Sequence, residues 1–215
     1  MAEQLAAMRV DYGAGGFDVG DLAPTWHEQL AAWLERAGAD GVVEPNAMVL
    51  ATAGDDGRPS SRTVLCKGLD ARGVVFYTNY TSAKSHDLRA TRYASATFPW
   101  YAQHRQVHVR GPVELVPTTE TQAYWSTRPR GSQLGAWASA QSAPVRGRRV
   151  LDDALAATTA RFDAQDPVPV PPHWGGWRIK PDQVEFWQGR SDRMHDRLRF
   201  ELTSDRSWTV RRLAP

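Results

Sequence analysis

The chain has 215 residues, of which 41% are hydrophobic and 23% charged, a composition typical of a folded globular protein. Its 26 basic and 24 acidic side chains leave a formal charge of only +2, which argues against a nucleic-acid-binding protein that relies on bulk charge, although local clusters can still bind small anions. A single cysteine allows no internal disulfide. No apolar run approaches the roughly 18 residues that span a bilayer, and residues 1–10 lack a secretory signal. We therefore expect a cytoplasmic protein with no membrane partner.

The N-terminal part of the chain predicts an arm and then a helix. Residues 1–20 are mixed in character and include the glycine-rich stretch 13–16, which indicates a flexible arm; residues 21–215 are expected to form one domain. A helix is predicted over residues 24–37, because bulky side chains recur there on one apolar stripe. The stripe consists of Trp26, Leu30, Trp33 and Leu34.

Three strands joined by tight turns are predicted next. They occupy residues 48–52, 61–67 and 74–78, and turn signals separate them at 55–59 and 70–73. Because short turns join antiparallel neighbours, whereas parallel strands need a longer crossover, we expect an antiparallel meander.

The rest of the chain alternates between helices and strands. Helices are predicted at 82–92 with Ser82 as the N-cap, at 118–126 with Thr118 or Thr119 as the N-cap, and at 150–162. Further strands are predicted at 94–100, 106–115, 176–179, 184–188, 198–202 and 208–212, with a stiff proline-rich connector at 167–172. Strands in hairpin succession, about eight or nine in all, predict a mostly β protein with peripheral helices (α+β), closed into an antiparallel barrel.

Several common sites are absent from the sequence. No glycine-rich dinucleotide or P-loop motif follows a strand. His104 and His108 are four residues apart, which on a strand is about 13 Å, too far for two ligands of one metal ion. Cys66 lies in an apolar strand and is interpreted as a buried structural thiol. We therefore expect no metal site.

Basic side chains beside hydroxyl groups indicate possible anion sites. Arg62 and Lys67 bracket one predicted strand, and strand alternation places them on opposite faces unless a bulge intervenes. Lys84 lies at a helix start, where backbone N–H groups can hold a phosphate. Similar clusters lie at 128–132 and 193–197. Each cluster alone is more often a solvated face or a local salt bridge.

An ordered set of motifs resembles one known family. The motifs are Arg62-Thr63-Val64-Leu65-Cys66-Lys67, Val75-Phe76-Tyr77-Thr78-Asn79, Phe98-Pro99-Trp100, Arg105-Gln106-Val107, Ser126-Thr127-Arg128-Pro129-Arg130, Ser132-Gln133-Leu134-Gly135-Ala136-Trp137, Gln141-Ser142, Trp174-Gly175-Gly176-Trp177-Arg178, Glu185-Phe186-Trp187-Gln188-Gly189, Arg193-Met194-His195-Asp196-Arg197 and Arg212-Leu213-Ala214-Pro215. Together they resemble the pyridoxamine/pyridoxine 5′-phosphate oxidase family of FMN-binding split β-barrel proteins. The resemblance runs in order from about Met8 to Pro215.

The resemblance implies two ligand-binding sets and a homodimer with FMN at the interface. The residues implied for FMN are Arg62, Val64, Lys67, Tyr77, Thr78, Lys84, Gln106, Gln141, Ser142, Trp187 and Arg197. Those implied for the substrate are Arg9, Tyr12, Lys67, Tyr124, Arg128, Ser132, Arg193 and His195, with Arg193 and His195 as the catalytic pair. Ala83 departs from the pattern, because many members of the family have an arginine there.

The implied reaction is oxidation at CH–NH2 and CH–OH groups. Pyridoxine 5′-phosphate (PNP) or pyridoxamine 5′-phosphate (PMP) would be converted to pyridoxal 5′-phosphate (PLP), with O2 consumed, hydrogen peroxide released and ammonia formed from the amine. One alternative is another split-barrel oxidoreductase that uses FMN or a deazaflavin on a different substrate, which the presence of the substrate residues disfavours. The other is a protein that binds flavin or PLP without turnover.

Overall fold

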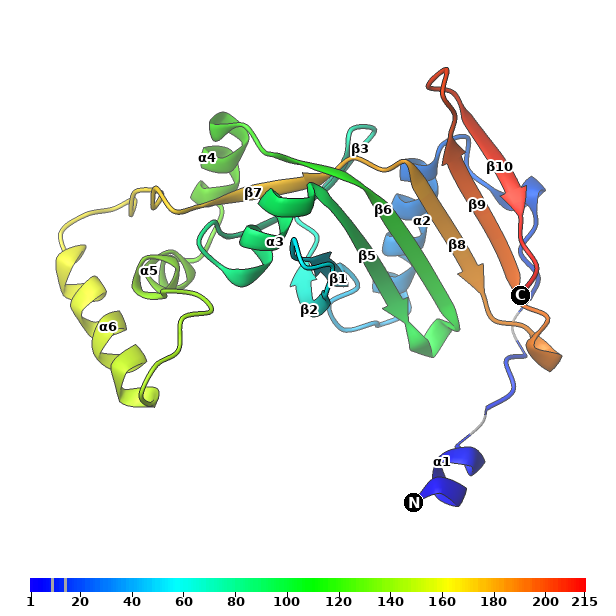
Figure 1. The fold of residues 1–215 in the computed structure, drawn as a ribbon, viewed down its shortest axis with the longest axis horizontal. Helices are drawn as coiled ribbons and strands as arrows, with labels where there is room; N and C mark the ends of the chain where they lie inside the picture. The colour runs from blue at the N-terminus through cyan, green and yellow to red at the C-terminus, as the bar shows by residue number, and fades with distance from the viewer. Residues whose placement is uncertain (9, 14) are drawn as a thin grey trace.

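The computed structural model describes residues 1–8, 10–13 and 15–215. Ten strands and six α-helices lie within these residues, with three short 3₁₀ helices (Figure 1). The strands are β1 (Ala47–Ala53), β2 (Pro59–Leu65), β3 (Gly68–Asp70), β4 (Gly73–Asn79), β5 (Tyr93–Trp100), β6 (Arg105–Leu115), β7 (Trp174–Ile179), β8 (Gln183–Gln188), β9 (Asp196–Leu202) and β10 (Trp208–Arg212). The helices are α1 (Ala2–Ala7), α2 (Trp26–Ala39), α3 (Ala83–Thr91), α4 (Thr118–Ser126), α5 (Arg130–Ala138), α6 (Arg148–Arg161), and the 3₁₀ helices η1 (Val19–Asp21), η2 (Tyr101–Gln103) and η3 (Ser191–Arg193).

The strands form one curled antiparallel arrangement, which confirms the predicted split-barrel fold. Its main path runs β10-β9-β8-β6-β5-β1-β2, and a second group, β3-β4-β7, joins it through β6. The long strand β6 makes this junction: residues 105–110 pair with β8, whereas residues 113–115 pair with β7. Helices α4, α5 and α6 lie together at the opposite end of the molecule from β8, β9 and β10 (Figure 1).

Two hydrophobic clusters stabilise the fold. The main one fills the curl of the sheet and includes Leu50, Phe98 and Phe186, against which α2 packs Leu30 and Trp33. The predicted apolar stripe of α2 is thus confirmed at Leu30 and Trp33, which are buried. The second cluster lies at the end of the molecule where α4, α5 and α6 are found, and it consists of Trp125, Leu134, Phe162, Val168 and Trp174.

The predicted meander is wrong in its third strand. The return strand stops at Leu65, and a separate short strand, β3, pairs with β4 instead. Strand β4 then pairs with β7, about a hundred residues further along the chain, and not with β2. Turn signals report only which neighbours are connected, so a pairing made by a distant segment leaves no local trace.

The predicted helices need smaller corrections. Helix α2 begins after Thr25, whose hydroxyl accepts from the Glu28 N–H at 3.3 Å, and not at the predicted proline. Helix α4 has Pro117 as its N-cap, so neither predicted threonine caps it. Ser82 is the N-cap of α3 as predicted, but its hydroxyl donates to the carbonyl of Asn79 and makes no capping bond. Helix α5 was not predicted as an element.

Gly111 is required where β6 changes partner. A Cβ atom at this position would lie 2.0 Å from the carbonyl oxygen of Lys180 and 2.9 Å from the backbone nitrogen of Asp182, and neither backbone group can rotate away. We expect Gly111→Ala to lower the free energy of unfolding by about 3 kcal/mol, measured by urea denaturation at fixed protein concentration.

Gly135→Ala is the matched control. Gly135 lies in α5, and a Cβ there would meet no heavy atom within 4 Å. Since alanine is the better helix former, this variant should be neutral or more stable by about 0.5–1 kcal/mol. Equal destabilisation by both substitutions would show that close packing at Gly111 is not the cause.

Within the part of the chain that the structure describes, none of the helices combines the length and the apolar composition needed to cross a bilayer.

Candidate functional site

A polar cavity of about 250 Å³ lies where β2, β4, α3 and α4 meet. Most residues predicted to bind FMN or the substrate phosphate line it. The lining residues are Arg62, Thr63, Val64, Leu65, Lys67, Tyr77, Thr78, Lys84, Tyr124, Arg128 and Gln141. The structure therefore brings together side chains that are up to 79 positions apart in the sequence.

Lys84 is the centre of a hydrogen-bonded group at one end of this cavity. Its ammonium group donates to Gln141 Oε1 at 2.6 Å and to Thr78 Oγ1 at 3.2 Å. Ser142 lies next to this group, and its hydroxyl accepts from the backbone N–H of Ala83 at 3.2 Å, at the start of α3. Burial and the nearby guanidinium of Arg62 lower the pKa of Lys84. The ammonium, amide, hydroxyl and helix start together suit a phosphate group.

Arg62 is held in place by groups that the sequence did not single out. Its guanidinium donates to Thr52 Oγ1 at 2.7 Å and to Ser60 Oγ at 2.6 Å, and lies 3.9 Å from Asp87. Thr52 in turn donates to Asp87 at 2.6 Å. Burial lowers the pKa of Arg62, although an arginine stays charged. Thr52 and Asp87 thus act as supports that orient a cation toward the cavity.

Arg62 and Lys67 line the same cavity, contrary to simple strand alternation. Strand β2 ends at Leu65, and the N–H of Lys67 donates to the carbonyl of Val75 at 2.8 Å. The chain has therefore left the regular β2 pattern before it reaches Lys67. The irregular segment plays the part of the bulge that the prediction left open. Cys66, within this segment, is buried as predicted, and burial raises its pKa to about 11.

An aromatic wall forms the other end of the cavity. The rings of Tyr77 and Tyr124 are stacked with centroids 4.1 Å apart, and Trp174 stacks on Tyr77 at 5.4 Å. The guanidinium of Arg128 lies over Trp174, 4.9 Å from the ring centroid, and donates to the carbonyl of Ser132 at 3.1 Å. Its Nε atom is buried without a hydrogen-bond partner among the described residues. A buried cationic donor of this kind is suited to an anionic ligand.

A second cavity, of about 860 Å³, lies beside η3 and the N-terminal arm. It contains both predicted catalytic residues and the predicted arm residue Tyr12. The lining residues are Leu5, Met8, Val10, Asp11, Tyr12, Trp187, Arg190, Asp192, Arg193 and His195. Arg9, also predicted to contact substrate, lies outside the described residues.

His195 is oriented by its neighbours in this second cavity. Its ring packs against Trp187 with centroids 4.6 Å apart and against Tyr12 at 5.8 Å. The backbone N–H of Arg190 donates to Nδ1 at 3.1 Å. The neutral ring therefore has its proton on Nε2, which makes no hydrogen bond to another described residue. Burial and the guanidinium of Arg193 lower the pKa of His195, which favours the neutral form.

Arg193 is held on a strained backbone. Its φ is +61° and that of Asp192 is +54°, in the left-handed region that few non-glycine residues adopt. No ion pair joins Arg193 to any other described residue. Residues with a strained backbone are often found at functional sites, and the charge of Arg193 has no carboxylate partner among the described residues.

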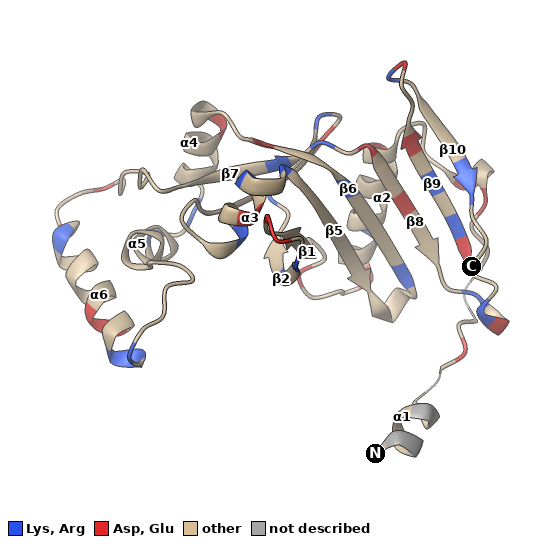
Figure 2. Ribbon diagram, viewed as in Figure 1, with Lys and Arg blue, Asp and Glu red and all other residues tan. Residues whose placement is uncertain are grey.

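Gln106, Trp187 and Arg197 form a row across three neighbouring strands. Gln106 on β6 pairs with Trp187 on β8, which pairs with Arg197 on β9. Arg197 is committed to Glu185 through two hydrogen bonds of 2.8 and 3.1 Å. Figure 2 shows acidic and basic positions following each other across β8 and β9. Glu185 was not predicted as a site residue, although it shares a face of β8 with Trp187.

One chain does not bring the two cavities together. They share no lining residue, and β1, β5 and β6 separate β2 from β8 in the sheet. The predicted catalytic pair, Arg193 and His195, thus lies apart from the predicted phosphate residues Lys67 and Arg128. A site built from both groups needs residues from two chains.

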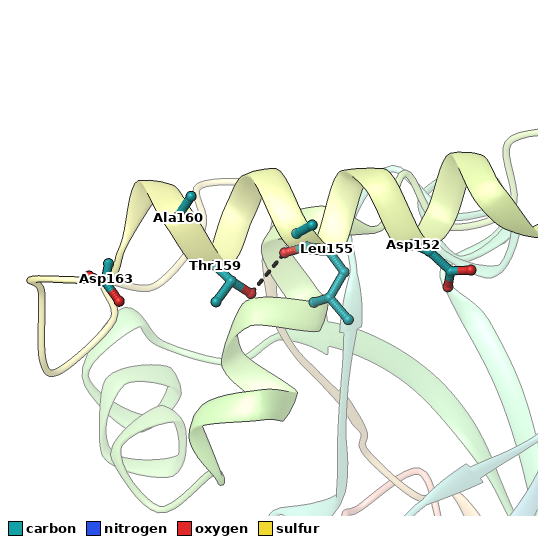
Figure 3. A pocket seen from close by; sticks show the side chains of 6 residues that line it. Asp152, Leu155, Thr159, Ala160 and Asp163 are labelled. Carbon is teal, nitrogen blue, oxygen red and sulfur yellow. Dashed lines mark hydrogen bonds between the residues drawn. The ribbon is translucent and has the colours of Figure 1, made fainter.

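A third depression, of about 700 Å³, lies on one face of α6 and contains no comparable group. Its side chains come from α6 and from Asp163 just after it, and the one hydrogen bond drawn in Figure 3 runs within the helix, from Thr159 Oγ1 to the carbonyl of Leu155 at 2.8 Å. Among the described residues, no group of three or more His, Cys, Asp or Glu side chains could hold a metal ion. Neither feature competes with the two cavities as a functional site.

Comparisons with known proteins agree with this geometry. Residues 27–162 match the family model described as pyridoxamine 5′-phosphate oxidase, and residues 174–215 match the pyridoxine 5′-phosphate oxidase C-terminal dimerisation region. A pyridoxine/pyridoxamine 5′-phosphate oxidase of Saccharopolyspora erythraea is 66% identical over 212 residues, which cover 98% of this chain and 95% of the relative.

Solved structures share the same fold. PhzG from Burkholderia lata, in complex with tetrahydrophenazine-1-carboxylic acid, superimposes with a TM-score of 0.87 at 32% identity, over 96% of this chain and 100% of that one. A pyridoxamine 5′-phosphate oxidase-related, FMN-binding protein of Nostoc punctiforme gives a TM-score of 0.72 at 20% identity, over 90% of this chain and 98% of that one, a likeness of fold alone.

Proposed function

The chain belongs to the pyridoxamine 5′-phosphate oxidase family, and from that premise we propose that it oxidises PNP and PMP to PLP with FMN as its cofactor. Oxygen would be the electron acceptor, hydrogen peroxide a product, and ammonia a further product from PMP. With one buried cysteine and no possible internal disulfide, the chain fits the reducing cytoplasm, where we place this reaction.

The observation that carries this proposal is a single cavity lined by four cations, Arg62, Lys67, Lys84 and Arg128. Arg62 lies near Lys84, whereas Arg128 lies over Trp174 in the aromatic wall. Two phosphate-bearing molecules, one the cofactor and one the substrate, account for two such groups.

The residues present suit FMN. The cofactor phosphate would be held by Arg62, Lys84, Ser142 and the N–H groups at the start of α3, and Gln141 would orient Lys84. The negative charge of Asp87 lies 3.9 Å from the Arg62 guanidinium, and Thr52 donates a hydrogen bond to the same carboxylate. When bound, the flavin supplies the redox chemistry by accepting a hydride and passing electrons to oxygen. Alanine at position 83 supplies no guanidinium, and its backbone N–H donates to the Ser142 hydroxyl.

The substrate phosphate would be held by Lys67, Arg128, Tyr124 and Ser132. Stacking of Tyr124 on Tyr77 and of Arg128 over Trp174 keeps these side chains in one orientation before the ligand arrives. Such preorganisation lowers the entropy cost of binding and fixes the reacting carbon at the distance the reaction needs.

The second half of the site would come from another copy of the chain. Trp187, Arg193 and His195 lie in the segment that matches a dimerisation region, residues 174–215. In a homodimer these residues would cover the cavity of the partner subunit, with the N-terminal arm closing over the substrate. Arg193 would hold the substrate ring in place, and His195 would donate a hydrogen bond or a proton from Nε2.

The decisive experiment uses the purified full-length protein. A flavin absorbance spectrum and, with PMP or PNP in air, formation of peroxide together with PLP are expected. Flavin without either product would support the binding protein that makes no turnover. Turnover of a different substrate, with PMP and PNP inert, would support another split-barrel oxidoreductase.

A further inference from the structure

Arg178 is a buried arginine that joins two carboxylates on different elements. It lies on β7, and its side chain is only 3% exposed. Its guanidinium lies 2.7 Å from Glu120 on α4 and 3.4 Å from Glu114 on β6. The Nε atom has no hydrogen-bond partner within the described part of the chain. A buried, incompletely satisfied arginine lowers stability compared with apolar packing, so its presence calls for another explanation.

Glu120 connects Arg178 to a second arginine. Arg72, in the turn between β3 and β4, donates to Glu120 at 2.7 Å and is itself fixed by Asp70. Glu120 lies in the first turn of α4, where the helix dipole also favours a negative charge. The hydrogen bonds from Arg72 and Arg178 hold the pKa of Glu120 below its usual value. The first turn of α4 is thus attached to both β7 and the β3–β4 turn.

Helix α4 carries the aromatic wall and the phosphate arginine further along. Tyr124 lies one turn after Glu120, and Tyr77, on which Tyr124 stacks, donates from its hydroxyl to the carbonyl of Glu120 at 3.3 Å. Arg128 follows directly after the helix and lies over Trp174. The residues that would meet the substrate phosphate therefore depend on where Glu120 is held.

Strand β7 contacts this segment at two points. Arg178 holds Glu120 in the first turn of α4, and Trp174, at the other end of the same strand, supports Arg128, two residues past the end of the helix. Both ends of the segment are therefore held by one strand.

We propose that Glu120, held by Arg178 and Arg72, is a positioning residue that sets Tyr124 and Arg128 for the substrate phosphate. This inference rests on the proposed function, since it assigns that phosphate to Arg128. Glu120 is not among the residues that line the cavity. It acts through the helix that carries the residues that do.

The test compares two isosteric neutral substitutions on the same arginine. Glu120→Gln weakens the attachment of α4, whereas Glu114→Gln weakens a contact with β6, which carries none of the phosphate residues. Both variants lose the carboxylate charge that faces Arg178, and each also loses one facing a second cation, Arg72 for Glu120 and Lys180 for Glu114. Glu120→Gln is expected to raise KM for PMP about tenfold with kcat within about twofold and flavin content unchanged, whereas Glu114→Gln leaves KM unchanged.

Binding of PLP to the flavin-loaded protein, by calorimetry, keeps this test separate from turnover. A weaker Kd in Glu120→Gln alone supports the positioning role even if the wild type oxidises neither PMP nor PNP, an outcome that sinks only the proposed reaction. Equal KM and Kd changes in both glutamate variants would overturn the inference. So would a fall in kcat and flavin content at unchanged KM, or a wild type that binds no PLP.

Discussion

Arg193→Leu is expected to lower kcat/KM for PMP about a hundredfold or more while the bound flavin stays at the wild-type level. Arg193 lies in the cavity beside His195, on a backbone in the left-handed region, and has no ion pair with another described residue. Its charge is therefore available to a ligand. The groups proposed to hold FMN, around Lys84, lie in the other cavity and do not change.

Arg190→Leu is the control for this substitution. Arg190 lines the same cavity, but its guanidinium lies 3.6 Å from Asp196 and is already paired. Its loss should cost far less turnover. Since Arg193 lowers the pKa of His195, Arg193→Leu should also raise that pKa toward its ordinary value, which an NMR titration of the ring measures without turnover. Loss of flavin in parallel with turnover would contradict the assigned role.

Local pattern predicted most elements of the fold, though not α5 or the short strand β3, and it did not predict all of the pairings. The apolar stripe of α2 and the alternation in β5 and β6 are properties of neighbouring residues, and they identify helix and strand correctly. The pairing of β4 with β7 joins segments almost a hundred residues apart. It depends on the curl of the whole sheet, and at Gly111 the absence of a Cβ leaves room for the Lys180 carbonyl, from which such an atom would lie only 2.0 Å.

The candidate site, too, was predicted only in part. Cations beside hydroxyls were visible as separate clusters, and only the fold joins Arg62, Lys67 and Lys84 in one cavity. The carboxylates that hold the arginines around the site were not recognised, because Asp87, Glu120 or Glu185 looks like any surface acid until its partners are known. Ion-pair partners distant in sequence have no spacing rule from which to predict them.

Two variants that are each inactive should regain activity when mixed, because each proposed site combines two chains. Arg128→Ala damages the cavity that holds the substrate phosphate, and Arg193→Leu damages the residues that cover the partner subunit's cavity. Random association makes about half of the dimers mixed, and each mixed dimer contains one site with both halves intact. The random mixture should therefore have about a quarter of the wild-type activity per chain, and the isolated mixed dimer about half.

The chains are co-expressed with different affinity tags, and the doubly tagged dimer is isolated and assayed with PMP. Matched control dimers combine either variant with itself and should stay inactive, while flavin content and elution volume stay at the wild-type level. A second experiment pairs a chain that carries both substitutions with a wild-type chain. Each site of this dimer then has one damaged half, so the dimer should have little activity although one chain is intact. Activity there at half the wild-type value, with none in the mixed single variants, would mean that each chain builds its own site. The separation of Arg193 and His195 from Lys67 and Arg128 within one chain argues for the opposite result.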